Sequence, residues 1–224
     1  MAENLLLIFA CSWAKSPDTT KNLSFQPDED HPALADLREE LRKSIVDGRN
    51  AIKDALDPNS RSPIPALDRY DGGMYKVEQF RQVIAQVVRE RQARVLILSG
   101  YYGLLTASER ILNYRKELDI AHWTQYRLPE AINQIMESWK IHRASAFLNK
   151  KGPYQCILRQ ASPPNTTMHF IKESSDPKFM YPALGHAIVQ FVQSGFRWET
   201  LTDFRFDSEV GTLSIEMEEL RRVI

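Results

Sequence analysis

The fold is decided by the stretch Val95-Leu96-Ile97-Leu98-Ser99-Gly100-Tyr101-Tyr102-Gly103-Leu104-Leu105, in which an apolar run turns into small and aromatic residues. A strand that is buried on both faces needs apolar side chains throughout, and glycines beyond its end let the backbone approach another group closely. In open α/β sheets, ligands bind outside the carboxyl ends of the strands. The stretch therefore predicts a buried strand at Val95–Leu98 whose end forms the wall of a site. An interpretation of equal weight is a plain turn whose two tyrosines cover the end of the sheet.

A second apolar run, Leu5–Ala10, predicts the first strand of the same sheet. Apolar residues at helical spacing follow it, although Gly48 and Asn50 weaken the middle of the first helical segment, which is therefore one bent helix or two. The same patterns predict helices over 32–57, 77–88, 127–147, 182–191 and 214–222, and strands over 154–158 and 167–171. Helices that alternate with buried strands are typical of an α/β sheet with crossover connections. We expect a mostly parallel sheet flanked by helices.

Length and charge restrict the possible classes of protein. A chain of 224 residues can bury one large core or two small ones. We predict a single α/β domain over 1–224, with a motif-bearing core at 5–120 and with 121–224 completing the sheet and the helical layers. The chain has 29 basic and 29 acidic residues, and this balance argues against a protein that holds nucleic acid by its total charge. A local basic groove remains compatible with it, because phosphate contacts depend on where the charges lie.

Several kinds of site and location are not supported by the sequence. Cys11 and Cys156 are far apart in the sequence, and neither they nor the histidines have metal-ligand spacing. Two distant cysteines favour a reduced cytoplasmic compartment. Glu3 stands where a signal peptide would carry Lys or Arg, and no apolar run is long enough to cross a bilayer. Neither a GxGxxG fingerprint nor a Walker-type lysine is present. We expect a cytoplasmic protein without a metal, a cofactor or a membrane partner; the sequence does not fix its oligomeric state.

Three motifs together resemble the signature of the YaaA family of peroxide-stress proteins and of small related proteins of phages and bacteria. They are Cys11-Ser12-Trp13-Ala14-Lys15, Pro65-Ala66-Leu67-Asp68-Arg69-Tyr70-Asp71-Gly72, and the Ser-Gly-x-Tyr-Gly turn at 99–103, with Glu109 and the Tyr-Arg-x-Glu pattern at 114–117 after it. The sequence departs from the family where Asn113 replaces the proline that usually precedes the motif tyrosine. It also lacks a counterpart of the helix-hairpin-helix-like DNA-binding element described for the family.

This resemblance implies a YaaA-like or uracil-DNA-glycosylase-like fold and a function on nucleic acid. The first hypothesis is a DNA-acting hydrolase that cleaves the N-glycosidic bond of a modified nucleobase, in defence or in a stress response. Such chemistry needs a pocket for an unstacked base, an aromatic platform, and a carboxylate near the sugar. The alternative is a non-catalytic DNA-binding protein that protects DNA during peroxide stress. DNA is the expected partner in both hypotheses.

The motifs supply candidates for each role. Asp71, Glu109 and Glu117 are the candidate catalytic carboxylates, Lys15 and Arg115 are candidates for phosphate binding, and Tyr102 is the candidate stacking platform. The full set of candidate binding residues is Cys11, Ser12, Lys15, Arg69, Tyr70, Ser99, Gly100, Tyr102, Tyr114 and Arg115.

Structural roles remain open for several of these candidates. Asp68 and Arg69 would equally cap or pair with neighbours, Arg115 with Glu117 would equally form a structural ion-pair network, and Cys11 is more typical of a small buried residue than of a nucleophile. If the motifs form one site, Lys15, Asp71, Tyr102 and Arg115 should line a common pocket.

Overall fold

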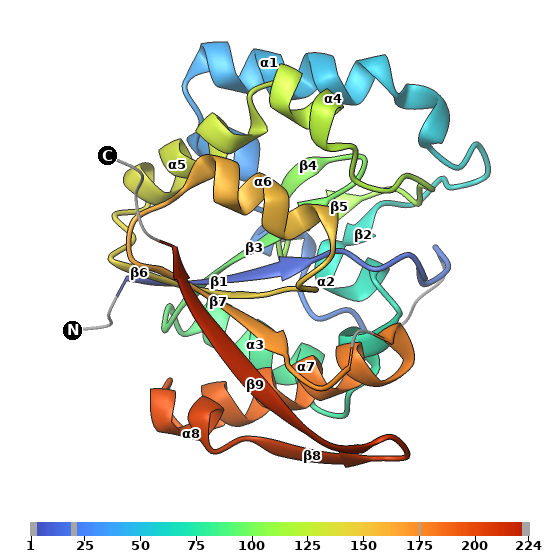
Figure 1. The fold of residues 1–224 in the computed structure, drawn as a ribbon. Helices are drawn as coiled ribbons and strands as arrows, with labels where there is room; N and C mark the ends of the chain where they lie inside the picture. The colour runs from blue at the N-terminus through green and yellow to red at the C-terminus, as the bar shows by residue number, and fades with distance from the viewer. Residues whose placement is uncertain (1–3, 19–21, 175, 221–224) are drawn as a thin grey trace.

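Seven strands form one sheet in the computed structural model, which describes residues 4–18, 22–174 and 176–220 (Figure 1). The order is β4-β3-β1-β6-β7-β9-β8, in which β3, β1, β6 and β7 are parallel while β4, β9 and β8 pair antiparallel at the two edges. The strands are β1 (Leu5–Ala10), β3 (Arg94–Ser99), β4 (Gly103–Thr106), β6 (Arg143–Phe147), β7 (Thr166–Ile171), β8 (Arg205–Ser208) and β9 (Gly211–Leu220). The α/β class and the predicted strands at 5–10, 95–98 and 167–171 are confirmed.

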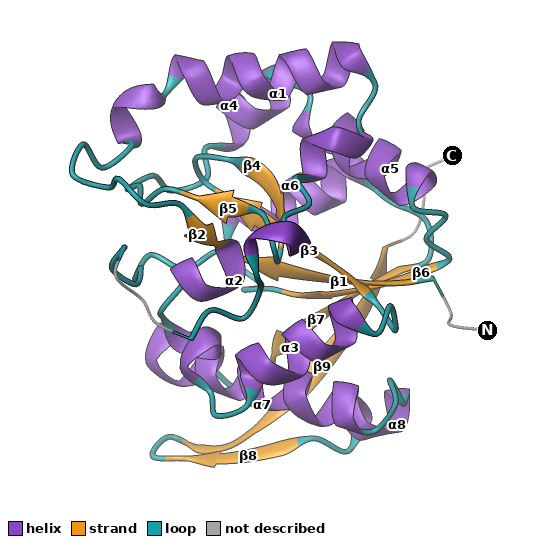
Figure 2. Cartoon of the chain, turned by 180° about the vertical axis from the view of Figure 1, so that it is seen from behind, coloured by secondary structure: helices purple, strands orange, loops and turns teal. Residues whose placement is uncertain are grey.

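Helices cover both faces of the sheet, as Figures 1 and 2 show from opposite sides. One face carries α1 (Glu39–Ala51), α4 (Ile120–Gln125), α5 (Leu128–Ser138) and α6 (Pro153–Ala161); the other carries α2 (Ala66–Arg69), α3 (Phe80–Arg89), α7 (Pro177–Gln193) and α8 (Trp198–Thr202). Successive residues of β1 point to opposite faces, so Leu7 joins one apolar cluster and Ile8 the other. No residue of β1 is more than 2% exposed, which explains its uninterrupted apolar sequence.

Shorter elements complete the chain. A separate two-stranded sheet pairs β2 (Ile64–Pro65) with β5 (Arg110–Ile111). The 3-10 turns are η1 (Pro27–Glu29), η2 (Ala33–Asp36), η3 (Lys53–Ala55) and η4 (Gly73–Lys76). The segment predicted over 32–57 is thus broken into η2, α1 and η3, with breaks at 37–38 and at 52, whereas Gly48 and Asn50 both lie inside α1. Within the described residues, no helix is both long and apolar enough to cross a membrane.

The sheet has a topological switch point between β1 and β6. The chain leaves β1 for its neighbour on one side, β3, whereas it leaves β6 for β7 on the other side. The segments that follow β1 and β6 therefore diverge and leave a crevice at the carboxyl ends of the two strands. This is the position at which open α/β sheets bind their ligands.

Three predicted elements are wrong in type, each for a recognisable reason. Residues 154–158 belong to helix α6, whose start is marked by Gly152 at the N-cap and Pro153 in the first turn. The helix predicted over 127–147 ends at Ser138, and 143–147 is instead strand β6, a short buried run that helical spacing cannot identify. The helix predicted over 214–222 is strand β9 through Leu220, where charged and apolar residues alternate; residues 221–222 lie outside the described residues.

The deciding stretch forms a hairpin as well as a strand. Gly103, at φ +75, begins β4, which pairs antiparallel with β3. The tyrosines do cover this end of the sheet, and Tyr101 is buried. Gly100 makes the close approach that its sequence predicts, because a Cβ there would lie 2.0 Å from the carbonyl oxygen of Lys116. The stretch is therefore a turn whose tyrosines cover the sheet end, and the prediction that it forms the wall of a site is wrong: none of residues 95–105 borders the cavity described below, and the turn instead supports the backbone at 116–117 from behind.

Candidate functional site

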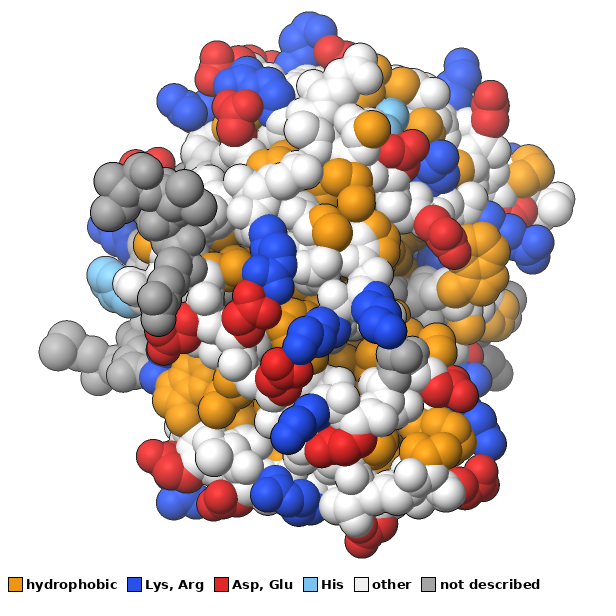
Figure 3. All heavy atoms as spheres, viewed as in Figure 1, with side chains coloured by type: hydrophobic (Ala, Val, Ile, Leu, Met, Phe, Trp, Pro, Cys, Tyr) orange, Lys and Arg blue, Asp and Glu red, His pale blue; other side chains and the backbone are white. Residues whose placement is uncertain are grey.

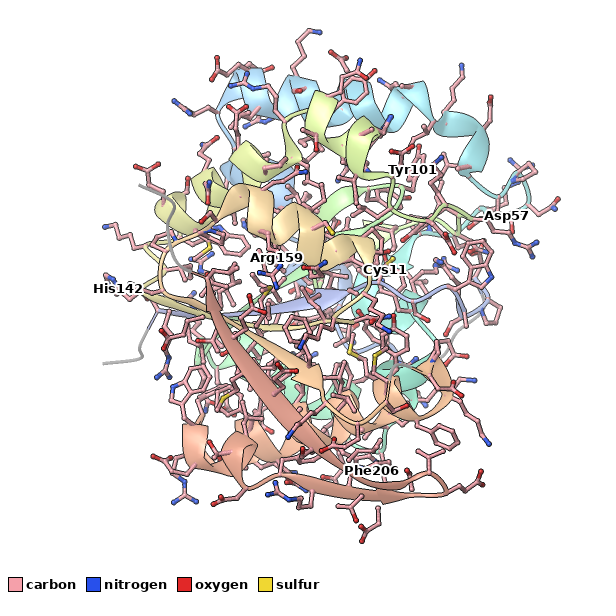
Figure 4. The ribbon with its side chains drawn as sticks, viewed as in Figure 1. Cys11, Asp57, Tyr101, His142, Arg159 and Phe206 are labelled. Carbon is pink, nitrogen blue, oxygen red and sulfur yellow. The ribbon has the colours of Figure 1, made fainter. Side chains whose placement is uncertain are left out.

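A cavity of about 590 Å³ lies at the switch point. Its walls come from segments that are distant in the sequence: residues 11–15 after β1, 72–75 around η4, 116–118, 149 and 152–154 after β6, and 177–178 with 181 in α7. Figure 4 shows Cys11 at the carboxyl end of β1, whereas His142 lies at the opposite end of the sheet. A larger hollow of about 780 Å³ is bordered by Asn4 and Arg94 at the amino ends of the strands, the edge where such sheets do not bind ligands.

Buried hydroxyl groups form a network next to the cavity. The Tyr114 hydroxyl lies 2.9 Å from that of Tyr70 and 2.8 Å from Ser99 Oγ. Cys11 Sγ lies 2.9 Å from the Tyr154 hydroxyl. Burial raises the pKa of all three tyrosines well above the ordinary value. Their hydroxyls therefore stay protonated and act as hydrogen-bonding groups, and their pairing explains why fully buried tyrosines are tolerated here.

Lys15 reaches from the loop after β1 to the edge of this network. Its Nζ donates to the carbonyl oxygens of Ser12 (2.7 Å) and Trp13 (3.0 Å) and lies 4.3 Å from the centre of the Tyr114 ring. Burial lowers the pKa of this amine; the nearby Cys11 opposes that shift, while the positive charges of Arg69 and Arg115 add to it. None of the described carboxylates forms an ion pair with Lys15.

The three candidate catalytic carboxylates occupy different environments. Glu117 is exposed and borders the cavity. Asp71 does not border it and instead pairs with Arg81, at 3.2 Å, and more weakly with Lys76. Glu109 is buried away from it. The prediction that Asp71 lines the common pocket is therefore wrong, because the arginine of the next helix draws its side chain aside.

Glu109 has the contacts of a structural residue. Its carboxylate accepts the backbone N–H of Ala33 at 2.9 Å and lies 3.5 Å from the guanidinium of Arg49. Burial raises the pKa of this carboxyl, although Arg49 and the hydrogen bond from Ala33 oppose the shift. Through these bonds, the residue ties the turn at η2 to the end of the β3–β4 hairpin.

Tyr102 lies outside the cavity wall, contrary to the predicted common pocket. Its hydroxyl accepts the backbone N–H of Leu112 at 3.0 Å, and the guanidinium of Arg49 lies 5.0 Å from its ring. Burial raises the pKa of this phenol to about 12. Lys15 and Tyr102 both contact the Tyr114 ring, so they lie near one another in the same region of the fold without sharing the pocket.

The two candidate arginines differ from one another. Arg69 is fully buried, donates to the carbonyl oxygens of Ser16 and Ser62, and pairs with Asp18 at 2.9 Å, which supports the structural alternative left open by the sequence. Arg115 is exposed and does not border the cavity, so it too falls outside the predicted common pocket. Its positive charge is nevertheless close enough to lower the pKa of Lys15.

The remaining candidate residues divide between the wall and its support. Cys11 and Ser12 border the cavity itself. Tyr70, Ser99 and Tyr114 support it through the hydroxyl network, and Gly100 supports it through its close approach to the 116–117 backbone. Four of these six residues thus support the wall and do not line the cavity.

One aromatic residue at the rim of the cavity, Trp13, was not among the predicted site residues. Trp13 borders the cavity and is 64% exposed, an unusual position for a large apolar side chain. Its position in the loop after the first strand, between the predicted binding residues Cys11 and Lys15, could have indicated that it belongs to the site. Tyr154 and Tyr181, from α6 and α7, also line the wall. They could not be placed at the site from the sequence, because 154–158 reads as a strand.

The cavity wall is cationic even though the chain is neutral overall. Lys15, Lys116 and Lys178 border it, and among its described lining residues Glu117 is the one carboxylate. Figure 3 shows positive and negative side chains intermixed on one face of the molecule. Outside the cavity lining, Lys150 pairs with Glu216. No group of three His, Cys, Asp or Glu side chains in the described part of the chain is placed to hold a metal ion.

Comparison with known proteins identifies the family. A family model described as peroxide stress protein YaaA matches residues 14–180. Two UPF0246 proteins of Cereibacter sphaeroides, from strains ATCC 17029 and KD131, are each 40% identical to this chain over 55 residues. That stretch covers 25% of this chain and 21% of each relative. Since the family match extends over most of the sequence and contains the second and third motifs together with Ala14 and Lys15 of the first, the chain belongs to the YaaA family of peroxide stress proteins.

Proposed function

We propose that this protein is a DNA-binding member of the peroxide stress response that holds an unstacked nucleotide in the cavity at its switch point. One observation carries the proposal: an exposed tryptophan, Trp13, stands at the rim of a cavity whose wall carries three lysines. Aromatic rings stack on any base, and lysines bind phosphates without regard to sequence. The family is named for peroxide stress, a condition that damages DNA, and this name supports a protective role that needs no bond cleavage.

The distribution of charge supports a local and salt-sensitive mode of binding. A protein without net charge attracts DNA only where its cations are not neutralised. Lys116 borders the cavity and forms no ion pair with the described residues, whereas Lys178 is 3.0 Å from Glu209. We therefore expect a small number of phosphate contacts centred on Lys116.

Fluorescence anisotropy with labelled DNA tests the proposal. The protein should bind single-stranded DNA, or a duplex with unpaired bases, more tightly than a fully paired duplex. Replacing Trp13 with Ala should weaken binding roughly 5- to 150-fold, since one stacked base contributes about 1–3 kcal/mol. The matched control is Met217→Ala, which also removes an exposed apolar side chain, but from β9 and not from the cavity rim. Equal affinity of Trp13→Ala and the parent protein would refute the proposal.

Lysine replacement gives an independent readout of the same complex. Lys116→Ala should weaken binding to all sequences alike and reduce the dependence of log K on log salt by about 0.7–0.9, the contribution of one phosphate contact. An unchanged salt dependence would show that Lys116 contacts no phosphate.

A second candidate is favoured by Glu117, the carboxylate at the cavity wall. In this candidate the protein is a DNA glycosylase-like hydrolase, and Glu117 orients water or stabilises positive charge at the sugar of a modified base. Base release should be measured from DNA with normal, oxidised or glucosylated bases. Loss of release in Glu117→Gln, with release retained in Asp71→Asn, would favour the hydrolase; absence of release beside clear binding favours the binding protein.

A further inference from the structure

We propose that Lys15 is a nucleophile that forms a reversible imine with the aldehyde of an abasic site in DNA. The inference rests on the proposed DNA binding and gives the cavity a specific ligand: a deoxyribose that has lost its base. Peroxide chemistry removes damaged bases and leaves such aldehydes, so the ligand belongs to the condition for which the family is named.

The position of the Lys15 amine is the first argument. Nζ borders the cavity and is fixed there by two backbone carbonyl oxygens, those of Ser12 and Trp13. A neutral amine has two N–H groups and one lone pair. When both N–H groups are donated to carbonyls, the lone pair remains available to attack a carbon atom. A lysine that served only to bind phosphate would extend its flexible side chain toward the ligand, whereas this amine is fixed by the backbone of its own loop.

The surroundings of Lys15 are the second argument. Nucleophilic lysines are activated by desolvation and by neighbouring cations, because both favour the neutral amine. Lys15 has both features, since it is partly buried and the guanidinium groups of Arg69 and Arg115 lower its pKa. Tyr114 favours the cation through its ring face, but no described carboxylate pairs with the amine. Lys178, in the same wall, differs because it pairs with Glu209.

Formation of the imine between Lys15 and the sugar aldehyde needs neither a cofactor nor an oxidant. The Nζ lone pair attacks C1′ of the ring-opened sugar, the carbonyl π electrons move to oxygen, and that oxygen takes up a proton to give a carbinolamine. Loss of water from the carbinolamine leaves the protonated imine, and addition of water reverses the sequence. No phosphodiester bond is broken. The chemistry retains the damaged sugar, and the cationic wall would hold its flanking phosphates.

Borohydride trapping tests this inference. A duplex with one abasic site is incubated with the protein, and sodium borohydride reduces any imine to a stable secondary amine, which is read as a shifted band on a denaturing gel. The parent protein should give the adduct, and peptide mapping should place it on Lys15. Lys15→Arg keeps the positive charge and should lose at least nine-tenths of the adduct, as should Lys15→Met. Lys43→Arg, on the exposed face of α1, is the matched control and should retain it.

Anisotropy with the same DNA, without borohydride, separates this inference from the proposed function. Binding of the abasic duplex with no adduct would overturn the imine and leave the DNA-binding proposal standing. An adduct that persists in both Lys15 variants, or that maps to another amine, would also overturn it. Absence of binding to any DNA would instead refute the proposed function. Thermal unfolding of each variant confirms that a lost adduct does not reflect a lost fold.

Discussion

Gly100→Ala should disrupt the cavity from behind its wall. A Cβ atom at this position would lie 2.0 Å from the carbonyl oxygen of Lys116 and 2.7 Å from the carbonyl carbon of Glu117. Both neighbours are backbone atoms, so no side chain can rotate to relieve the contact. The segment would have to retreat by about 1–1.5 Å to reach ordinary van der Waals separation. Since Lys116 and Glu117 border the cavity, this movement reshapes the site.

The expected cost of Gly100→Ala is that of overpacking a well-packed position, about 1–3 kcal/mol. For a chain of this length, that corresponds to a fall in the melting temperature of about 2–12 °C. DNA affinity should fall as well, because a lysine displaced by about 1 Å no longer meets its phosphate in the same geometry. The two effects should appear together, since one backbone shift causes both.

Thermal unfolding and DNA anisotropy on the same preparation would measure these effects. Gly152→Ala is the matched control, because this glycine also borders the cavity but a Cβ there would meet its nearest atom at 3.3 Å, and its φ of −86° suits alanine. Its stability should stay within about 1 kcal/mol of the parent. A Gly100→Ala protein with parental melting temperature and affinity would refute the claim that this turn supports the wall.

Other replacements test the structural roles assigned above. His169→Phe should raise stability more at about pH 5 than at about pH 7.5: burial lowers the imidazole pKa to about 3, so the unfolded chain binds the proton first and stability falls as the pH drops below about 6.5. A shift that is equal at both pH values in calorimetry would contradict this. Tyr102→Phe should cost about 1–3 kcal/mol in chemical denaturation, because the N–H of Leu112 loses its partner. DNA affinity should not change; a selective loss of affinity would return Tyr102 to the site. Arg49→Ala should cost about 3–5 kcal/mol because it leaves the Glu109 carboxylate buried without its cation. Adding Glu109→Gln should recover part of that loss, and no recovery would show that the pair is not coupled.

The sequence was most informative where a local pattern and the fold agree. The strands at 5–10 and 95–98 are buried on both faces, so their composition alone identifies them. Helix α7 (Pro177–Gln193) was recognised only over 182–191, because Pro182, which lies inside the helix, resembles the proline of a helix start. Strand β6 was not identifiable because Ala-Ser-Ala-Phe is too short and too small in side-chain size to separate a buried strand from the end of a helix. Strand β9 was misread because its glutamates face Lys150 and Arg159, partners that only the folded sheet supplies.

The site could be predicted as a region but not residue by residue. Residues 11–15, the motif after the first strand, form part of the cavity wall, because the carboxyl end of a strand beside a switch point opens onto the crevice. The carboxylates could not be ranked, since their roles depend on partners that are distant in sequence: Arg81 for Asp71, and Arg49 for Glu109. Trp13 stood in the first motif and was passed over in favour of tyrosines that the structure buries.

The contrast between paired and unpaired charges is what singles out the cavity. Arg69 is buried and pairs with the Asp18 carboxylate, and Glu109 is buried and pairs with the Arg49 guanidinium, because an unpaired buried charge would be expensive. Lys15 departs from this pattern: it is partly buried, lies near two guanidinium groups, and has two carbonyl oxygens, the Tyr70 and Tyr114 rings and Cys11 near its amine, with no ion pair to a described carboxylate. The fold must offset that cost elsewhere, and a structural lysine would have no reason to incur it. A ligand that supplies phosphates or an electrophilic carbon would interact with this unpaired amine. We therefore expect the functional site at the cavity and not on the surface where charges of both signs are intermixed.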